Sequence, residues 1–223
     1  MLENVKVPLE YEKDNKERKP WEYYLEEFKK IDPIEASKRL EVPYDEENQI
    51  FKFYLMGSTY YIHYPSFEVT HKEDNLVSHP LEENIYAKIL IARLFIEGKY
   101  EAFTEEFVSY RDIPWGEFYY VPFSGRCIGR LARKYGNRID IFEKIMIKIG
   151  AEKVNYGDVA YDFKFMNDLY VRFIIWQGDE EFSPSAQILF SKNFASFFNA
   201  EDLAYVGDLC NNNFNIVEKT MNK

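Results

Sequence analysis

The stretch Leu169–Lys192, LYVRFIIWQGDEEFSPSAQILFSK, predicts two β-strands joined by an acidic loop. Its first part, Leu169–Trp176, alternates apolar and other side chains with the period of two that is typical of a strand with a buried face. Gln187–Ser191 is a second apolar run, short enough to be another strand. The residues between them, 177–186, contain glycine and proline, which favour turns. We therefore expect an antiparallel strand pair with a long loop at one end.

This loop is the first candidate site, because Asp179, Glu180 and Glu181 follow one another between the aromatic residues Trp176 and Phe182. Loop carboxylates bind hard cations such as Mg²⁺ or act as general acids and bases. Three adjacent side chains cannot all point the same way, so at most two of them converge. In the structural alternative, one carboxylate caps main-chain N–H groups and another pairs with an arginine. The spacing matches no EF-hand or other metal motif.

A second acidic turn lies just before the predicted strand Val159–Met166. Asp158 follows Gly157 there, and an aspartate in a turn usually bonds its local backbone. In the functional alternative, Asp158 joins Asp179 across neighbouring strands at the same edge of the sheet. The candidate ligand-binding residues are therefore Asp158, Trp176, Asp179, Glu180 and Glu181.

The rest of the chain alternates helical segments with hairpin-like pairs of apolar runs, which favours an α+β fold over a doubly wound sheet. Hairpins are expected at residues 49–64, around Gly57-Ser58, and at residues 159–176. About six helices are expected, over Pro20–Lys30, Pro33–Leu40, Leu81–Gly98, Ser124–Tyr135, Ile139–Ile149 and Ala200–Val217. They would pack on a mixed or mainly antiparallel sheet in a single domain over residues 19–223. Residues 1–18 are expected to be loosely ordered, with at most a short edge strand of Val5, Val7 and Leu9.

Composition restricts the possible functions. The 223 residues carry a net charge of −10, which does not favour binding to nucleic acid or to an anionic membrane. The two cysteines, Cys127 and Cys210, are 83 positions apart (210 − 127), so this chain alone makes no disulfide framework and no four-cysteine metal or iron–sulfur site. The N-terminal residues lack the apolar run of a signal peptide, and no apolar run reaches the ~20 residues of a membrane span. We expect a cytoplasmic protein.

A row of arginines is a further candidate. Arg126, Arg130 and Arg133 recur at helical spacing in a helix that is expected to open at Ser124. A helix N-terminus with arginines above it binds phosphate or carboxylate groups. The alternative is a solvated stripe on an amphipathic helix.

Two other patterns have a functional and a structural interpretation. His63, His71 and His79 are eight residues apart, without the close ligand pair that zinc sites normally show. Pro114–Phe123, PWGEFYYVPF, is expected to be an aromatic loop that forms the wall of a site for a flat ligand or for a partner protein, or that packs in the core.

Several segments carry a family resemblance. Trp176–Phe182 reads WQGDEEF, and Ile188–Phe190 and Glu201–Leu203 follow it. The other matching segments are Gly157–Phe163, Tyr110–Pro114 and Gly57. Over these segments, from about Trp21 to the C-terminus, the chain resembles the domain of unknown function 3786 family.

The resemblance implies a protein of anaerobic bacteria or archaea with no established activity, so it supplies no catalytic residues. Some relatives carry a cysteine-rich iron–sulfur segment of the kind found beside corrinoid proteins. This sequence has two cysteines, and such a role would have to come from a partner.

These observations support three hypotheses. The leading one is a ligand-binding or accessory protein of anaerobic metabolism, with a pocket beside the 177–186 loop. The second is an enzyme that uses Asp179 or Glu181 as general acid or base, with or without a divalent metal. The third is a protein-interaction module that presents Pro114–Phe123. The expected partner is a small molecule or another protein, and the sequence does not identify a cofactor.

Overall fold

The computed structural model describes residues 9–221, with side chains from residue 17 onward. Six helices in this range have eight residues or more: α1 (Leu9–Phe28), α2 (Pro33–Leu40), α4 (Ile85–Glu97), α5 (Gly116–Phe123), α7 (Ile139–Lys148) and α9 (Ala200–Met221). The shorter ones are α3 (Pro80–Glu83), α6 (Gly129–Tyr135), α8 (Phe194–Phe197), the 3₁₀ turn η1 (Tyr110–Asp112) and the π-helical turn η2 (Ser124–Ile128).

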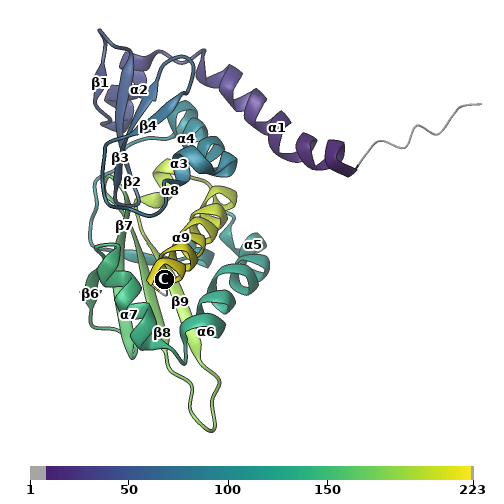
Figure 1. The fold of residues 1–223 in the computed structure, drawn as a ribbon, viewed down its shortest axis with the longest axis vertical. Coiled ribbons are helices and arrows are strands. Elements are labelled where there is room, and N and C mark those ends of the chain that lie inside the picture. The colour runs from purple at the N-terminus through teal and green to yellow at the C-terminus, as the bar shows by residue number, and fades with distance from the viewer. Residues whose placement is uncertain (1–8, 222–223) are drawn as a thin grey trace, which may run out of the picture.

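The strands form two antiparallel sheets, which confirms the α+β class. The first sheet has the order β1-β2-β3-β4 and the second the order β5-β9-β8-β7-β6. The strands of the first sheet are β1 (Tyr44–Asp45), β2 (Ile50–Leu55), β3 (Ser58–His63) and β4 (Val69–His71). Those of the second are β5 (Phe107–Ser109), β6 (Glu152–Val154), β7 (Val159–Met166), β8 (Leu169–Trp176) and β9 (Ser185–Ser191). Figure 1 shows one sheet above the other along the long axis of the molecule.

The predicted strand pair is the centre of the larger sheet. β8 and β9 pair antiparallel with Phe173 opposite Ile188, and both side chains are buried. The predicted hairpin between β7 and β8 is also confirmed, with Asn167 and Asp168 between the two strands. In the other hairpin, Met56 and Gly57 make the turn, both with positive φ. The turn therefore lies one residue earlier than predicted.

A hydrogen bond between main-chain groups joins the two sheets. The N–H of Met56, in the β2–β3 turn, donates to the carbonyl oxygen of Phe165 in β7 over 2.7 Å. Buried side chains of both sheets belong to one continuous hydrophobic cluster, in which Phe51 and Phe173 are fully buried. The two sheets therefore share a core.

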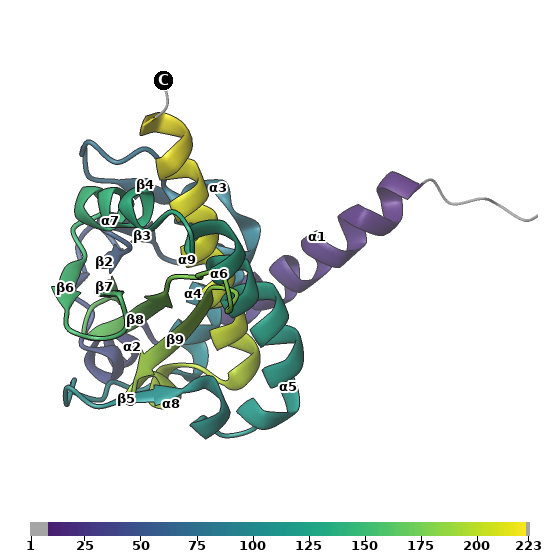
Figure 2. The ribbon, with the colours of Figure 1, turned by 90° about the horizontal axis from the view of Figure 1, so that it is seen from below.

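Helices cover one face of the larger sheet. Phe214 of α9 packs edge-on against Phe173 of β8, with 4.9 Å between ring centroids, and Phe142 of α7 contacts both Phe214 and Tyr161. Figures 1 and 2 both place α5 and α6 on the same side of β8 and β9 as α9, with α5 at the periphery.

Two predicted helix boundaries are wrong. α1 begins at Leu9 rather than at Pro20, so Leu9 is helical; the rest of the predicted edge strand, Val5 and Val7, lies outside the described residues. The predicted helix at 81–98 is split by Asn84, whose side chain caps the N-terminus of α4. Asparagine competes for main-chain N–H groups in this way, which favours a new helix start.

The largest correction concerns Pro114–Phe123, which is helical from Gly116 onward rather than a loop. The helix continues through η2 into α6, so residues 116–135 form one helical segment. Pro122 removes a main-chain donor from it, and the π-helical turn follows two residues later. Proline and glycine in this stretch therefore mark an irregular helix and not a loop.

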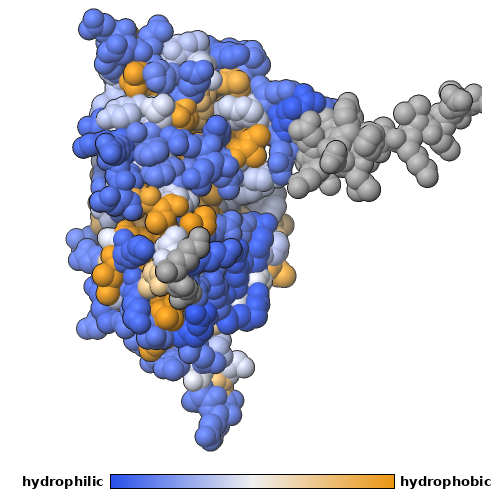
Figure 3. All heavy atoms as spheres, viewed as in Figure 1, coloured by the Kyte–Doolittle hydropathy of each residue, from blue (hydrophilic) through white to orange (hydrophobic). Residues whose placement is uncertain are grey.

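The surface is mostly hydrophilic on the face drawn in Figure 3, with apolar side chains gathered near the C-terminal end of α9. In the described part of the chain, no helix is both long and apolar enough to cross a membrane.

Candidate functional site

The carboxylates of the predicted site bond to main-chain amides. Asp179 Oδ1 accepts hydrogen bonds from the N–H groups of Glu181 and Phe182, at 2.9 and 2.7 Å. Asp158 Oδ2 accepts one from the N–H of Gln177 at 2.7 Å, which ties the entry of β7 to the exit of β8. These are turn contacts of the kind that the structural alternative described.

The other predicted residues of this loop point to solvent. Glu180 and Glu181 are exposed, and Trp176 is partly exposed. Figure 1 shows the β8–β9 connection leaving the body of the molecule at its lower end. None of these residues lines either of the two cavities described next. Their role in ligand binding stays a prediction.

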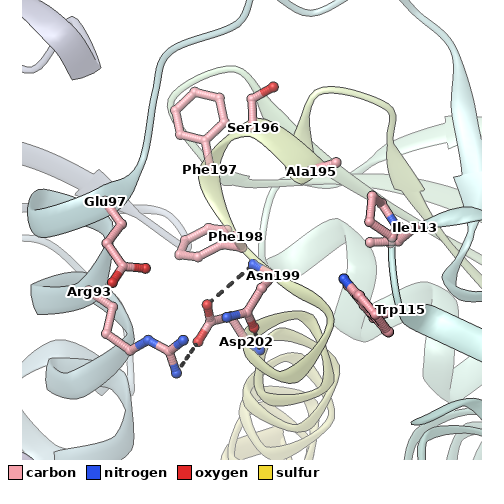
Figure 4. A pocket seen from close by; sticks show the side chains of 11 residues that line it. Arg93, Glu97, Ile113, Trp115, Ala195, Ser196, Phe197, Phe198, Asn199 and Asp202 are labelled. Carbon is pink, nitrogen blue, oxygen red and sulfur yellow. Dashed lines mark hydrogen bonds and ion pairs between the residues drawn. The ribbon is translucent and has the colours of Figure 1, made fainter. Parts of the chain in front are cut away.

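A cavity of about 220 Å³ lies at the start of α9. Its wall comes from α4, from the turn between η1 and α5, and from the chain that links α8 to α9, as Figure 4 shows. Arg93 and Asp202 supply charge on one side, while Phe197, Phe198 and Trp115 supply aromatic surface. This combination of apolar walls with a few polar groups is typical of small-molecule sites.

The polar part of the cavity is a buried ion pair between two helices. Arg93 Nη1 of α4 lies 2.9 Å from Asp202 Oδ1 of α9, and their side chains are only 16% and 7% exposed. Asp202 also belongs to the N-terminal cap of α9, because its Oδ2 accepts a hydrogen bond from the N–H of Asn199 at 3.3 Å and its own N–H donates to Asn199 Oδ1 at 3.0 Å. The carboxylate is therefore held from two directions.

This ion pair is not fully satisfied. Burial raises the pKa of Asp202 to about 6, against the opposing effect of the Arg93 charge. The Nε atom of Arg93 is buried and has no hydrogen-bond partner. Buried donors without partners are uncommon in native proteins and point to a strained or functional environment.

Trp115 forms the opposite rim of the cavity in an unusual conformation. Its φ of +67° lies in the left-handed region, which is costly for a large side chain, and its side chain is 73% exposed. The next residue must be glycine, because a Cβ at Gly116 would lie 1.8 Å from the carbonyl oxygen of Tyr110. The chain thus holds a tryptophan at the surface beside the cavity.

A second cavity of about 220 Å³ lies on the other side of the ion pair. Arg93 and Asp202 line both cavities, and Tyr24, Tyr86 and Tyr205 line the second. The rings of Tyr86 and Tyr205 stack at 5.3 Å, and the Arg93 guanidinium lies 5.4 Å from the Tyr24 ring centroid. The ion pair therefore separates the two cavities, one lined by Trp115 and the other by tyrosines.

Sequence reasoning missed Arg93 and Asp202. They are 109 positions apart (202 − 93) and meet only when α4 packs against α9. One signal was present: Arg93 is the single charged residue in the apolar run Ile89–Phe95, ILIARLF. A charge within the buried face of a helix requires a buried partner.

The histidines are only partly brought together. His71 and His79 stack with 3.6 Å between ring centroids, whereas His63 lies in β3. One ring nitrogen of each stacked histidine bonds a carboxylate, Glu82 for His71 and Asp74 for His79. Within the described residues, no group of three or more histidine, cysteine or acidic side chains is arranged to hold a metal ion.

The arginine row does not lie at a helix N-terminus, because Ser124 is inside the continuous helical segment. Arg126 pairs with Asp208 at 2.7 Å, and Arg130 donates to Asn212 Oδ1 at 2.9 Å. The predicted anion site at Ser124 is therefore wrong. Arg133 remains exposed on the surface.

Fold and cavity together define an α+β protein with a buried ion pair between two small cavities. The chain belongs to the family described as Domain of unknown function (DUF3786), whose model matches residues 32–212. The match includes Arg93 and Asp202 and confirms the resemblance noted in the sequence. No curated protein and no solved structure is significantly similar to the chain.

Proposed function

We propose that this protein binds a small, flat organic molecule in the cavity between Trp115 and the Arg93–Asp202 pair. The observation that carries the proposal is the pair itself, buried yet open to a cavity on each side. Burying two charges costs free energy, which a structural ion pair recovers only when its hydrogen bonds are complete. Here Arg93 Nε lacks an acceptor, so the pair is not optimised for stability alone.

The charges of the cavity select the polar group of the ligand. Glu97 and Asp202 contribute two carboxyl groups against the single guanidinium of Arg93. An anion is therefore disfavoured, whereas a group that both donates and accepts hydrogen bonds, such as a carboxamide, suits the site. The aromatic rings of Trp115 and Phe198 offer faces for a flat ring. A volume of about 220 Å³ lies below the roughly 300–1,000 Å³ of sites for drug-sized ligands, so the ligand is a small molecule.

Three phenyl compounds of nearly equal size test this selection: benzamide, benzoate and benzylamine. We expect benzamide to raise the midpoint of thermal unfolding in a saturable way, because a ligand that binds only the native state stabilises it. Benzoate should have the smallest effect. Tryptophan fluorescence in a Trp21→Phe, Trp176→Phe background reports binding at Trp115 alone. If none of the three compounds gives a saturable response, the proposal is wrong.

A cavity-filling variant gives the matched control. Ala195 lines the cavity and is exposed, so Ala195→Trp occupies the space without disturbing the core. Ala102 is also exposed and does not line the cavity, so Ala102→Trp adds the same side chain elsewhere. We expect the benzamide response to disappear in Ala195→Trp and to persist in Ala102→Trp. Equal responses in both variants would place the binding elsewhere.

The other hypotheses drawn from the sequence remain predictions. An accessory role in anaerobic metabolism rests on the sequence resemblance alone, and a test of it requires the natural ligand. The surroundings of Asp179 and Glu181 do not support an enzyme that uses either residue as general acid or base, because Asp179 caps its own turn and Glu181 is exposed. Loss of benzamide binding in Asp179→Asn, with binding intact in Ala195→Trp, would favour the 177–186 loop over the cavity.

A further inference from the structure

The second cavity, on the other side of the ion pair, has no part in the proposed function. Three helices contribute its aromatic and charged residues: Tyr24 of α1, Tyr86 and Arg93 of α4, and Glu201, Asp202 and Tyr205 of α9. Glu201 and Tyr205 are four positions apart, and Tyr86 and Arg93 are seven, so each pair lies on one face of its helix. The volume of about 220 Å³ exceeds the ~150 Å³ of an apolar cavity that holds benzene, so a small molecule fits.

Three tyrosine rings give this cavity its aromatic surface. Tyr86 and Tyr205 stack across the α4–α9 contact with 5.3 Å between ring centroids. Burial raises the pKa of both phenols above the ordinary value, so both rings are neutral at physiological pH. The face of such a ring attracts a positive charge. The third ring, Tyr24, already has one beside it, because the Arg93 guanidinium lies 5.4 Å from its centroid.

Carboxylates outweigh cations around the cavity. Glu201 and Asp202 line it, and the hydroxyl of Tyr86 donates to Glu17 Oε1 at 3.4 Å. Arg93 supplies one positive charge, which Asp202 balances at 2.9 Å. Glu201 and Glu17 therefore make the surroundings of the tyrosine rings net negative. The second guanidinium near Tyr205, that of Arg126, is likewise balanced by an acidic partner on α9.

Aromatic faces and negative charge in one cavity favour a positively charged ligand. We propose that the second cavity binds a small organic cation, with an alkylammonium or quaternary ammonium group against the tyrosine rings. Aromatic side chains recognise quaternary ammonium groups in this way. An anion would instead meet Glu201 and Asp202. Within the described residues, no group of three or more acidic, histidine or cysteine side chains is arranged to hold a metal ion, so the charge belongs to an organic group.

Three compounds of the same branched shape test the preference for positive charge. They are choline, its neutral analogue dimethylbutanol, with a tert-butyl group in place of trimethylammonium, and the anion tert-butylacetate. At constant ionic strength and pH 7.5, we expect choline to raise the midpoint of thermal unfolding in a saturable way. The alcohol should have a smaller effect and the anion none. No saturable response to choline would overturn the proposal, as would equal responses to choline and the alcohol.

Variants of the lining residues test the position of the site. Tyr205→Leu removes one ring and should raise the choline dissociation constant about tenfold, whereas Tyr205→Phe retains the ring and should raise it much less. Glu201→Gln removes an exposed charge and should raise it about threefold. Glu152→Gln is the matched control, since Glu152 is exposed on β6 and does not line the cavity. Circular dichroism shows whether each variant is folded.

Choline binding that folded Tyr205→Leu and Glu201→Gln variants both retain in full would place the cation elsewhere and overturn the proposal. Ala195→Trp separates the two cavities, because Ala195 lines the first and not the second. We expect this variant to lose the benzamide response and to keep the choline response. Loss of the choline response as well would assign the cation to the first cavity, which also overturns the proposal. Either site can therefore fail its test without the other.

Discussion

Arg93 Nη1 and Asp202 Oδ1 lie 2.9 Å apart, and the contact joins a helix of the first half of the chain to the last helix. Phe214 of α9 packs against Phe163 of β7 and Phe173 of β8, so this contact also links α4 to the helix that covers the larger sheet. Its residues are the first to test, because the pair affects both stability and the proposed site.

Removing one partner of this pair should be costly. In Arg93→Met, the Asp202 carboxylate remains buried without its cation, and breaking a buried pair in this way costs about 3–5 kcal/mol. The double variant Arg93→Met, Asp202→Leu should lose less, because no uncompensated charge remains. Urea unfolding at pH 7.5 measures both. Equal losses in the single and double variants would show that the two side chains are not coupled.

Asp202 should also make stability depend on pH. Its pKa rises from an ordinary 3.8 to about 6 on folding, so between these values the folded state binds more protons than the unfolded state. Its contribution to stability is therefore complete below pH 3.8 and is lost as the pH rises through 6. At about 1.36 kcal/mol per pKa unit, the loss is about 3 kcal/mol.

Asp202→Asn removes this dependence. Compared with the wild type, the variant should gain relative stability between pH 4 and pH 7, as measured by urea unfolding across that range. Parallel stability curves for the two proteins would show that the Asp202 carboxyl does not titrate in this window.

The turn at Trp115 should not tolerate a side chain at Gly116. Gly116→Ala places a Cβ 1.8 Å from the Tyr110 carbonyl oxygen, so the backbone must move. We expect a loss of about 1–3 kcal/mol in the free energy of unfolding, as for other overpacked sites. Gly125→Ala is the control, because its Cβ meets nothing within 4 Å and alanine favours the helix. A larger loss in Gly125→Ala than in Gly116→Ala would contradict the geometry.

Both cysteines should be unreactive in the folded protein. Burial raises the pKa of the Cys127 thiol to about 12, and the pKa of the fully buried Cys210 is raised as well. The thiolate is the reactive form, so a disulfide reagent such as Ellman's should label neither at pH 8 and both after denaturation. Rapid labelling of one thiol in the native protein would show that the helices around it open readily.

Asp179 should stabilise its loop rather than the whole protein. Asp179→Ala removes the acceptor of two main-chain N–H groups, whereas Asp179→Asn retains an Oδ1 acceptor. Because the loop is exposed, we expect the alanine variant to lose about 0.5–1.5 kcal/mol and the asparagine variant less. Amide hydrogen exchange at Glu181 and Phe182 should accelerate in Asp179→Ala. Unchanged exchange would show that these contacts do not hold the loop.

Local patterns predicted the strands well but did not indicate the cavity at the start of α9. The alternation in Leu169–Trp176 and the helical spacing in Ala200–Val217 are determined by neighbours in the sequence, and both elements are confirmed. The helix at Gly116 was missed because proline and glycine outweighed the helical spacing, and here an irregular turn accommodates them.

The cavity could not be predicted from the sequence, for a different reason. Arg93 and Asp202 acquire their environment only through the packing of α4 on α9, and neither belongs to a motif. By contrast, the acidic run Asp179–Glu181 is conspicuous in the sequence but lies where solvent and main-chain amides satisfy it. A run of charged residues in a loop is thus satisfied by solvent and main-chain amides, whereas a single charge on the buried face of a helix indicates a buried partner.

The hydrogen bond from Met56 to Phe165 has a consequence for any attempt to divide the molecule. A shortened chain that ends before β5 would leave the β2–β3 turn without its acceptor and expose the apolar side of the smaller sheet. The complementary half would lose α4, the helix that meets α9. Neither piece is expected to fold alone, so the two halves should melt in a single cooperative transition.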